Sequence, residues 1–317
     1  MKREQKKKKN NLLLLLAPLL LFAAGAGIFL YPAISNYLAE RQQTEVIHTY
    51  QAKVNEMDQA EIDAAWQAAA EYNENLAGDP VHDPFVMGSG YVLPDNYEDV
   101  LNVNGDGVMG YIDIPKIDVY LPIYHGTSEE VLAEGAGHLE MTALPIGGNN
   151  RHPVISAHRG LPSAELFTRL DEMKVGDQFY IHVLDQTLAY EVDQIEVILP
   201  EELSLLQPEE DKDLVTLLTC TPYAVNTHRL LVRGTRVPYD ESTDEESNRT
   251  ADRESTWLSE YLHAILAGIL LLLVLVAAVI ALKRRKRRTQ VSINGDENAA
   301  TPRRSRKKRG RRRGKRR

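Results

Sequence analysis

The chain has 317 residues, of which 43% are hydrophobic and 26% are charged, a composition that is ordinary for a folded protein. Its single cysteine, Cys220, excludes an internal disulfide. The formal net charge of −8 hides a segregation: 24 of the 37 basic residues lie in 1–9 and 283–317, whereas 42 of the 45 acidic residues lie between them. Basic ends around an acidic middle are typical of a membrane protein.

The chain opens with a basic stretch, residues 1–11, that precedes an apolar run over residues 12–31. This run is close to the ~20 residues that a helix needs to cross the hydrocarbon core. A cleaved signal peptide is the alternative, because residues 12–22 could form its apolar region and small residues follow. The apolar run continues to Leu30, and this length favours an uncleaved transmembrane anchor.

Residues 32–80 predict a helical stalk or clamp between the membrane and the main domain. The Ala-rich sequence around Trp66 has strong helix propensity, and a helix is expected from Glu40 to Asn75. Gly78 and Pro80 then end it.

A loop is predicted over residues 81–92, and it contains Asp83-Pro84-Phe85. In an extended chain, residues two apart point the same way, so Asp83 and Phe85 could present a carboxylate and a ring to one surface. From spacing alone, a simple turn before a core phenylalanine is the preferred interpretation.

Short strands with frequent turn signals predict a β-barrel or sandwich over residues 93–240, which is long enough to bury one substantial core. Strands are expected near 110–114, 117–123, 152–157, 177–184, 187–198, 214–220 and 229–237. Short helices are expected at Ser128 to Glu134 and Ser163 to Met173.

Cys220 closes one predicted strand and Arg229 opens the next, with a short Pro-containing loop between them. A hairpin of this kind puts both residues at the same end of the sheet. A thiol beside a guanidinium suggests a nucleophile with a partner for an oxyanion. The alternative is a buried core cysteine, which is the commoner fate of a lone thiol.

His158 follows the predicted strand 152–157, and reactive groups are often exposed just after strands. The sole cysteine has no CxxC partner, and neither an HExxH motif nor a Gly-rich phosphate loop occurs. The sequence therefore predicts no metal site and no cofactor.

An acidic linker, residues 241–256, leads to a second predicted transmembrane helix over 257–282, and a basic tail over 283–317 follows. The positive-inside rule puts both termini in the cytoplasm and the acidic middle outside the cell membrane. The tail could bind nucleic acid. Its position directly after a membrane span favours anionic lipid, at about 1 kcal/mol per basic residue near the surface.

Three segments together resemble the sortases, the cysteine transpeptidases of Gram-positive bacterial surfaces. Residues 216–220, Thr-Leu-Leu-Thr-Cys, resemble the TLxTC signature, 226–234 resemble the segment with the essential arginine, and 156–160 resemble the segment with the essential histidine. The resemblance covers roughly 105–240. It implies an eight-stranded sortase β-barrel with N-terminal helices, and His158, Cys220 and Arg229 as catalytic residues.

Two features resemble class C, the pilus-assembling sortases. One is the second membrane span, and the other is Asp83-Pro84-Phe85, which is similar to the Asp-Pro-aromatic lid motif of that class. The resemblance replaces the simple-turn interpretation. It implies that Asp83 pairs with Arg229 and that Phe85 covers Cys220, although many relatives have Trp at this position.

The resemblance also implies the chemistry. Cys220 attacks the Thr–Gly bond of an LPXTG-like sorting signal, and the thioester is resolved by a pilin lysine. Ser156 and Thr219 are candidates for lining the substrate groove, whereas Arg233 and Arg236 are expected to be solvent-facing barrel residues.

Three alternatives remain open: a sortase that anchors surface proteins to peptidoglycan, a hydrolytic cysteine peptidase, and a membrane-tethered scaffold with basic tails. The scaffold leaves the combination of His158, Cys220 and Arg229 unexplained.

Overall fold

A computed structural model describes residues 2–76, 96–240, 266–274, 277–278 and 281. The chain divides into two compact units. One comprises residues 1–24 and 255–317, and the other comprises residues 25–254 and holds the whole β-sheet.

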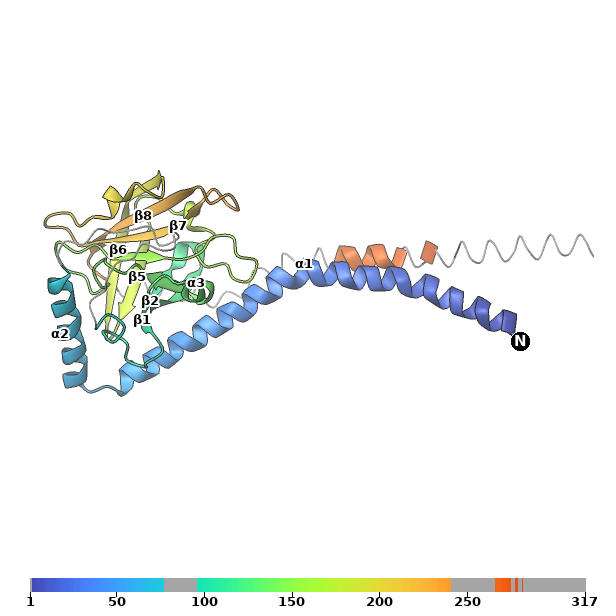
Figure 1. Cartoon of the computed structure of the whole chain (residues 1–317), viewed down its shortest axis with the longest axis horizontal. Helices are drawn as coiled ribbons and strands as arrows, with labels where there is room; N and C mark the ends of the chain where they lie inside the picture. Colours follow the sequence, from blue (N-terminus) through green and yellow to red (C-terminus); the bar gives the residue numbers. More distant parts are fainter. Residues whose placement is uncertain (1, 77–95, 241–265, 275–276, 279–280, 282–317) are drawn as a thin grey trace, which may run out of the picture. The chain divides into compact units, whose positions relative to one another are not determined.

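The sheet is a closed barrel of eight strands, as expected (Figure 1). The strands are β1 (Val108–Ile114), β2 (Val119–His125), β3 (Ala136–His138), β4 (Val154–Ser156), β5 (Gln178–Val183), β6 (Gln186–Ile198), β7 (Leu214–Thr221) and β8 (His228–Val237). Their order around the barrel is β1-β2-β3-β4-β7-β8-β6-β5, and β5 pairs back to β1. The β2–β3 and β4–β7 pairs are parallel and the others are antiparallel.

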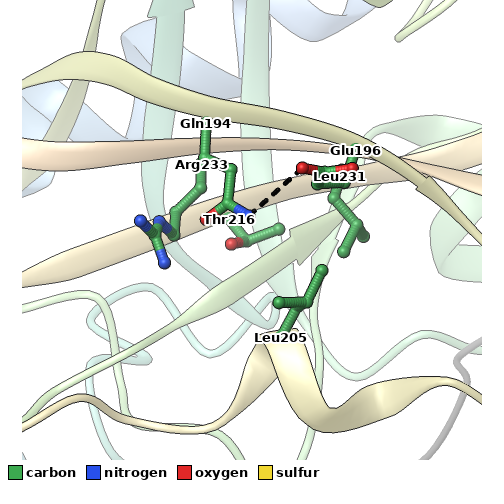
Figure 2. A pocket seen from close by; sticks show the side chains of 6 residues that line it. All are labelled: Gln194, Glu196, Leu205, Thr216, Leu231 and Arg233. Carbon is green, nitrogen blue, oxygen red and sulfur yellow. Dashed lines mark hydrogen bonds between the residues drawn. The ribbon is translucent and has the colours of Figure 1, made fainter.

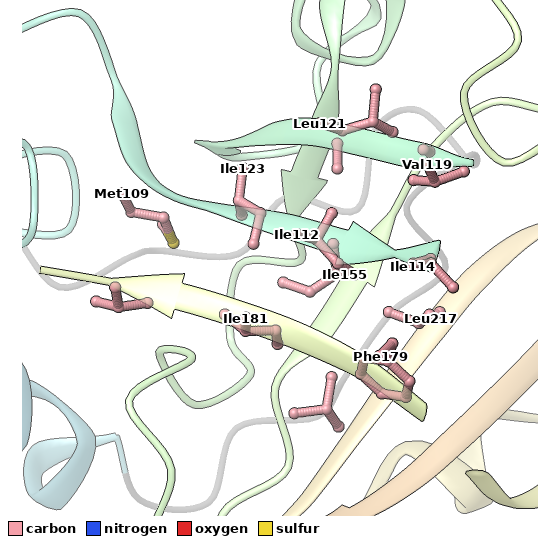
Figure 3. Close-up of a cluster of buried hydrophobic side chains, with 14 of the residues drawn as sticks. Met109, Ile112, Ile114, Val119, Leu121, Ile123, Ile155, Phe179, Ile181 and Leu217 are labelled. Carbon is pink, nitrogen blue, oxygen red and sulfur yellow. The ribbon is translucent and has the colours of Figure 1, made fainter. Parts of the chain in front are cut away.

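Alternate residues of the strands fill the barrel with branched aliphatic side chains (Figure 3). Ile155 of β4 and Leu217 of β7 lie in this core beside Phe179 of β5, and all three are fully buried. The core thus holds β4 and β7 together although they are far apart in the sequence.

Two helices precede the barrel. The first, α1, spans Lys2–Glu56, and the second, α2, spans Gln59–Asn75. The single helix expected from Glu40 to Asn75 is therefore interrupted, because Asp58 caps α2: its carboxylate accepts from the backbone N–H of Glu61, whose side chain bonds back to the N–H of Asp58.

Both helices pack against the barrel, and Figure 1 shows α2 along its side. Tyr50 of α1 is buried; its hydroxyl accepts from the N–H of Leu184 at 2.8 Å and donates to the carbonyl of Met109 at 3.2 Å. Asn73 of α2 exchanges two hydrogen bonds with the backbone of Leu144. Residues 32–80 were expected to form a stalk or a clamp. These contacts hold the helices against the barrel, as a clamp would.

Two short elements differ from the sequence prediction. The strand β3 was not expected, because three residues are too few for a periodic pattern. The prediction of a helix at Ser163 to Met173 is wrong. The segment consists mainly of turns, with a 3₁₀-helix at Leu170–Glu172. Leu166 has φ +45°, outside the helical region, and the N–H of Phe167 bonds to the carbonyl of His158 instead of continuing a helix. The helix α3 (Glu129–Glu134) forms as expected, with Ser128 as its cap.

Within the described residues, one helix segment, Leu20–Glu56, is long and apolar enough to cross a membrane. It fits either a membrane anchor or a signal sequence. The predicted second span, 257–282, lies largely outside the described residues, and its described part at 266–274 is helical.

Candidate active site

Cys220 and Arg229 face each other across the β7–β8 pair. The antiparallel register makes them direct partners, as the hairpin prediction expected. Cys220 is 6% exposed and Arg229 is 5% exposed. The thiol and the guanidinium therefore belong to one nearly buried place at the end of the sheet.

The parallel register of β4 and β7 brings His158 to the same place. Ser156 is the partner of Leu218, and the N–H of Ala157 donates to the carbonyl of Leu218 at 3.2 Å. If this register is continued by two residues beyond the end of β4, it places His158 opposite Cys220, at the ~4.8 Å spacing of neighbouring strands. From this register we infer a row of the three predicted catalytic residues: His158 just after β4, Cys220 on β7 and Arg229 on β8.

The row lies on the outer face of the barrel. Leu217 and Leu230 belong to the interior core, whereas Leu218 and Leu231 belong to a second apolar cluster. Because successive side chains of a strand alternate between faces, Cys220 shares the outer face with Leu218, and Arg229 shares it with Leu231. The side chains of Cys220 and Arg229 therefore do not point into the barrel core.

The segment after β4 is held by its own contacts. Arg159 donates to the hydroxyl of Thr221 at 3.1 Å and to the carboxylate of Asp171 at 2.5 Å. Gly160 has φ +82°, and a Cβ there would meet the Tyr223 ring at 2.9 Å, so a larger residue would strain the backbone and displace the ring. These contacts tie the chain beside His158 to the β7–β8 loop. Sequence reasoning did not single out Arg159, although it lies within the sortase-like segment 156–160.

His158 is half-buried, and this burial lowers the pKa of its imidazole below the ordinary 6.5. The nearby carboxylate of Glu129 opposes that shift. The imidazole is therefore mostly neutral near pH 7, and in this form it can accept a proton.

The guanidinium of Arg229 is fixed by the loop that precedes β8. Its Nη1 donates to the carbonyls of Asn226 and His228, both at 3.2 Å. A guanidinium fixed on the strand beside a thiol is a candidate hydrogen-bond donor to an oxyanion that forms at that thiol.

Ser156 and Thr219, the candidates for lining the groove, are both fully buried. The hydroxyl of Thr219 donates to the carbonyl of Ala157 at 2.7 Å, so it joins β7 to the residue before His158. In this structure both side chains lie beneath the site and expose no surface to a groove.

One of the two rival arginines, Arg233, differs from expectation. The side chain of Arg233 is only 12% exposed and is paired with acidic groups, so the prediction that it faces solvent is wrong. Arg236 is 31% exposed and lies 3.7 Å from Asp213. Carboxylates on neighbouring segments cover the Arg233 guanidinium, which strand alternation alone does not reveal.

The predicted lid residues Asp83, Pro84 and Phe85 lie outside the described residues. Across the part of the chain that the structure describes, no group of three or more His, Cys, Asp or Glu side chains is arranged to hold a metal ion.

Comparison with known proteins decides the family. The model of the sortase domain matches residues 112–237. The crystal structure of sortase C from Streptococcus pneumoniae is 49% identical, with a TM-score of 0.57, over 62% of this chain and 97% of that one. The chain belongs to the sortase family.

This sortase resembles other solved members of class C. Sortase C1 of Streptococcus agalactiae is 46% identical over 62% of this chain and 95% of that chain, with a TM-score of 0.57. Sortase C-1 of Actinomyces oris is 47% identical over 56% of this chain and 99% of that chain, with a TM-score of 0.54. Among curated relatives, sortase A of Bacillus anthracis is 26% identical over 68% of this chain and 90% of its own length. The sequence-based recognition of a class C sortase is confirmed, and with it a cysteine transpeptidase.

Proposed function

We propose that this sortase cleaves an LPXTG-like sorting signal between Thr and Gly and joins the acyl group to a pilin lysine. The observation that carries the proposal is the strand register, which pairs Cys220 with Arg229 and brings the segment that ends at His158 to the same end of the sheet. The sortase C of Streptococcus pneumoniae, described with reference to pilin substrate specificity, supports a pilin as the substrate.

The first half-reaction forms a thioester. As Cys220 Sγ attacks the threonine carbonyl, the neutral imidazole of His158 accepts the thiol proton. The carbonyl oxygen becomes an oxyanion that accepts a hydrogen bond from Arg229, an interaction that is typically worth about 3–4 kcal/mol. The C–N bond then breaks, and His158 returns the proton to the leaving glycine amine.

The second half-reaction resolves the thioester. The neutral ε-amine of a pilin lysine attacks the thioester carbonyl, and His158 accepts the proton that this amine loses. Arg229 again donates to the oxyanion. The C–S bond breaks, the thiol recovers its proton from His158, and an isopeptide bond joins two pilin subunits. No cofactor is required by this sequence of steps.

A test of the function compares acceptors. Purified enzyme is incubated with an LPXTG-like peptide, alone or with a pilin fragment that carries its acceptor lysine, and the products are identified by mass. We expect an isopeptide-linked product with the fragment, and little of it when that lysine is replaced by arginine. Products from water alone would indicate a hydrolytic peptidase, and preferential transfer to peptidoglycan amines would indicate an anchoring sortase.

We also propose, as part of the same function, that the loop with Asp83 and Phe85 is a lid over the active site. Asp83 would pair with Arg229 and Phe85 would cover Cys220, so the resting site would be closed. An exposed ion pair is worth only about 0–1 kcal/mol and ring packing on sulfur about 0.3–1.5 kcal/mol. The closed state would therefore be favoured by roughly ten-fold, a bias that substrate binding can overcome.

Replacing both Asp83 and Phe85 by alanine is expected to speed alkylation of Cys220 by a small thiol reagent by roughly ten-fold. The chain has no other cysteine, so the reaction reports on this thiol alone. Ser89→Ala in the same loop is the matched control. Equal alkylation rates for the wild type and the double variant would show that Phe85 does not shield the thiol.

The membrane arrangement is also proposed. The apolar helix segment Leu20–Glu56 and the basic residues before residue 12 support an N-terminal anchor. With a second span over 257–282, both termini would lie in the cytoplasm, the barrel outside, and the basic tails against anionic lipid.

A further inference from the structure

The loop between β6 and β7, residues 199–213, starts beside the site and then covers the outer face of the sheet. Ile198, the last residue of β6, is the direct partner of Arg229. Leu206 of the loop is fully buried in the second apolar cluster with Leu218 and Leu231. These two leucines precede Cys220 and follow Arg229 by two residues, on the same face. The loop therefore forms a wall of the strip of sheet that leads to the thiol.

The loop packs closely on the part of the sheet that it covers, next to that strip. The 3₁₀-helix η3 (Leu203–Leu206) lies over β7 and β8, and Figure 2 shows Leu205 directed towards Leu231 and Thr216. The space enclosed there is only about 10 Å³. A change in the loop would thus alter the wall directly, since the space between these described residues is too small to absorb the change.

One polar anchor of the loop is Arg233 of β8. Its guanidinium makes two hydrogen bonds of 2.9 Å to the carboxylate of Asp193 on β6. A third, to Glu209 of the loop, is 2.5 Å long. The carboxylate of Asp193 holds the planar guanidinium in one orientation, so Nη1 is aimed at Glu209. Arg233 thereby joins the loop to two strands of the barrel.

A second anchor is His152, just before β4. It is 1% exposed, its Nδ1 lies 2.9 Å from the carbonyl of Gln207, and its Nε2 lies 2.7 Å from the hydroxyl of Thr216. A carbonyl only accepts, so Nδ1 carries the proton and Nε2 accepts from Thr216. The neutral imidazole satisfies both bonds, and it ties the loop to β7 two residues from Leu218.

We propose that Arg233, Glu209 and His152 are positioning residues that hold loop 199–213 as a preformed wall for the donor peptide. The inference rests on the proposed function, because the wall matters only if a sorting signal occupies the strip beside Cys220. If the wall is preformed, donor binding does not carry the entropic cost of ordering the loop, and binding is therefore favoured. None of the three residues belongs to the row that makes and breaks bonds. Their loss should raise KM for the donor and leave kcat nearly unchanged.

The test removes the ion pair from the loop side. Glu209→Ala is expected to raise KM for an LPXTG-like peptide by about five-fold, the upper range for a partly exposed ion pair, and to change kcat by less than about two-fold. The matched control is Glu210→Ala, which removes the same charge from the next, exposed residue. It should leave both constants unchanged.

A double-mutant cycle with Arg233→Lys addresses the pair itself. Lysine keeps the charge and loses the fork that bonds Asp193 and Glu209 together. If the two residues act through one contact, the double variant should raise KM less than the product of the two single effects. Amide hydrogen exchange within 203–207 should be faster in Glu209→Ala than in Glu210→Ala, and this readout does not depend on activity.

The outcomes separate the two proposals. A wild-type enzyme with no activity on sorting-signal peptides, but with exchange protection that depends on Glu209, would overturn the proposed function and leave the loop contact standing. An active enzyme whose KM is the same in Glu209→Ala and Glu210→Ala would overturn the positioning role. A fall in kcat with KM unchanged would also overturn it, because the residues would then act on the chemical steps.

Discussion

Replacing Cys220 by alanine is expected to abolish the thioester intermediate, and with it both cleavage and transfer. The sulfur of Cys220 is the nucleophile, and alanine has no atom that can form the acyl bond. Incubation with an LPXTG-like peptide followed by intact-mass measurement should show an acyl adduct on the wild type and none on the variant. If the alanine variant still polymerised pilin, Cys220 would not be the nucleophile.

The fold of this variant should survive. Cys220 lies at the end of β7, and the strand is held by its ladder to β8 and by the bond from Thr219 to Ala157. The lost burial is that of one sulfur atom at a 6% exposed position. Thermal unfolding of the two proteins should therefore nearly coincide, so lost activity would report on chemistry. As an independent check, alkylating the single thiol of the wild type should have the same effect as the substitution.

Replacing Arg229 by lysine is expected to lower kcat/KM for the donor peptide roughly 100- to 1,000-fold, the usual loss for one oxyanion donor. The charge is kept, but a lysine ammonium cannot reproduce a guanidinium that is held by the carbonyls of Asn226 and His228. Single-turnover measurement of thioester formation isolates the affected step.

Arg236→Lys is the matched control, since it makes the same change on the same strand at the end away from Cys220. We expect it to keep kcat/KM within about two-fold, because the pair with Asp213 is partly exposed and contributes little. If Arg229→Lys were as active as this control, Arg229 would not be the oxyanion donor.

Local features of the fold were predictable. The strands around Cys220 and Arg229 carry continuous β-branched and aliphatic runs, and the short loop between them predicts a hairpin. The structure confirms that pairing, with the two residues as direct partners. The lid and the roles of His158, Cys220 and Arg229 remain predictions. The lid residues, within 81–92, lie outside the described residues.

Other features depended on contacts between distant segments. The strand β3 has three residues, and it exists because β2 and β4 pair with it on either side. The segment at Ser163 to Met173 has helical composition, yet one of its backbone N–H groups bonds to the carbonyl of His158. Arg233 was expected at the surface because the pattern of its own strand gives no sign of Asp193 and Glu209, which lie on other segments and pair with it.

By itself, the sequence determined the β-rich class, the hairpin of Cys220 and Arg229, and the motifs that resemble the sortases, because these depend on neighbouring residues and on strand alternation. Only the tertiary structure decided that β4 lies parallel to β7, and so brought His158 to the row. The same holds for loop 199–213, which rests on the outer face through Arg233 and His152. Such pairings join residues tens of positions apart, and they form because the barrel core buries Ile155 and Leu217 together, a long-range gain that no local pattern encodes.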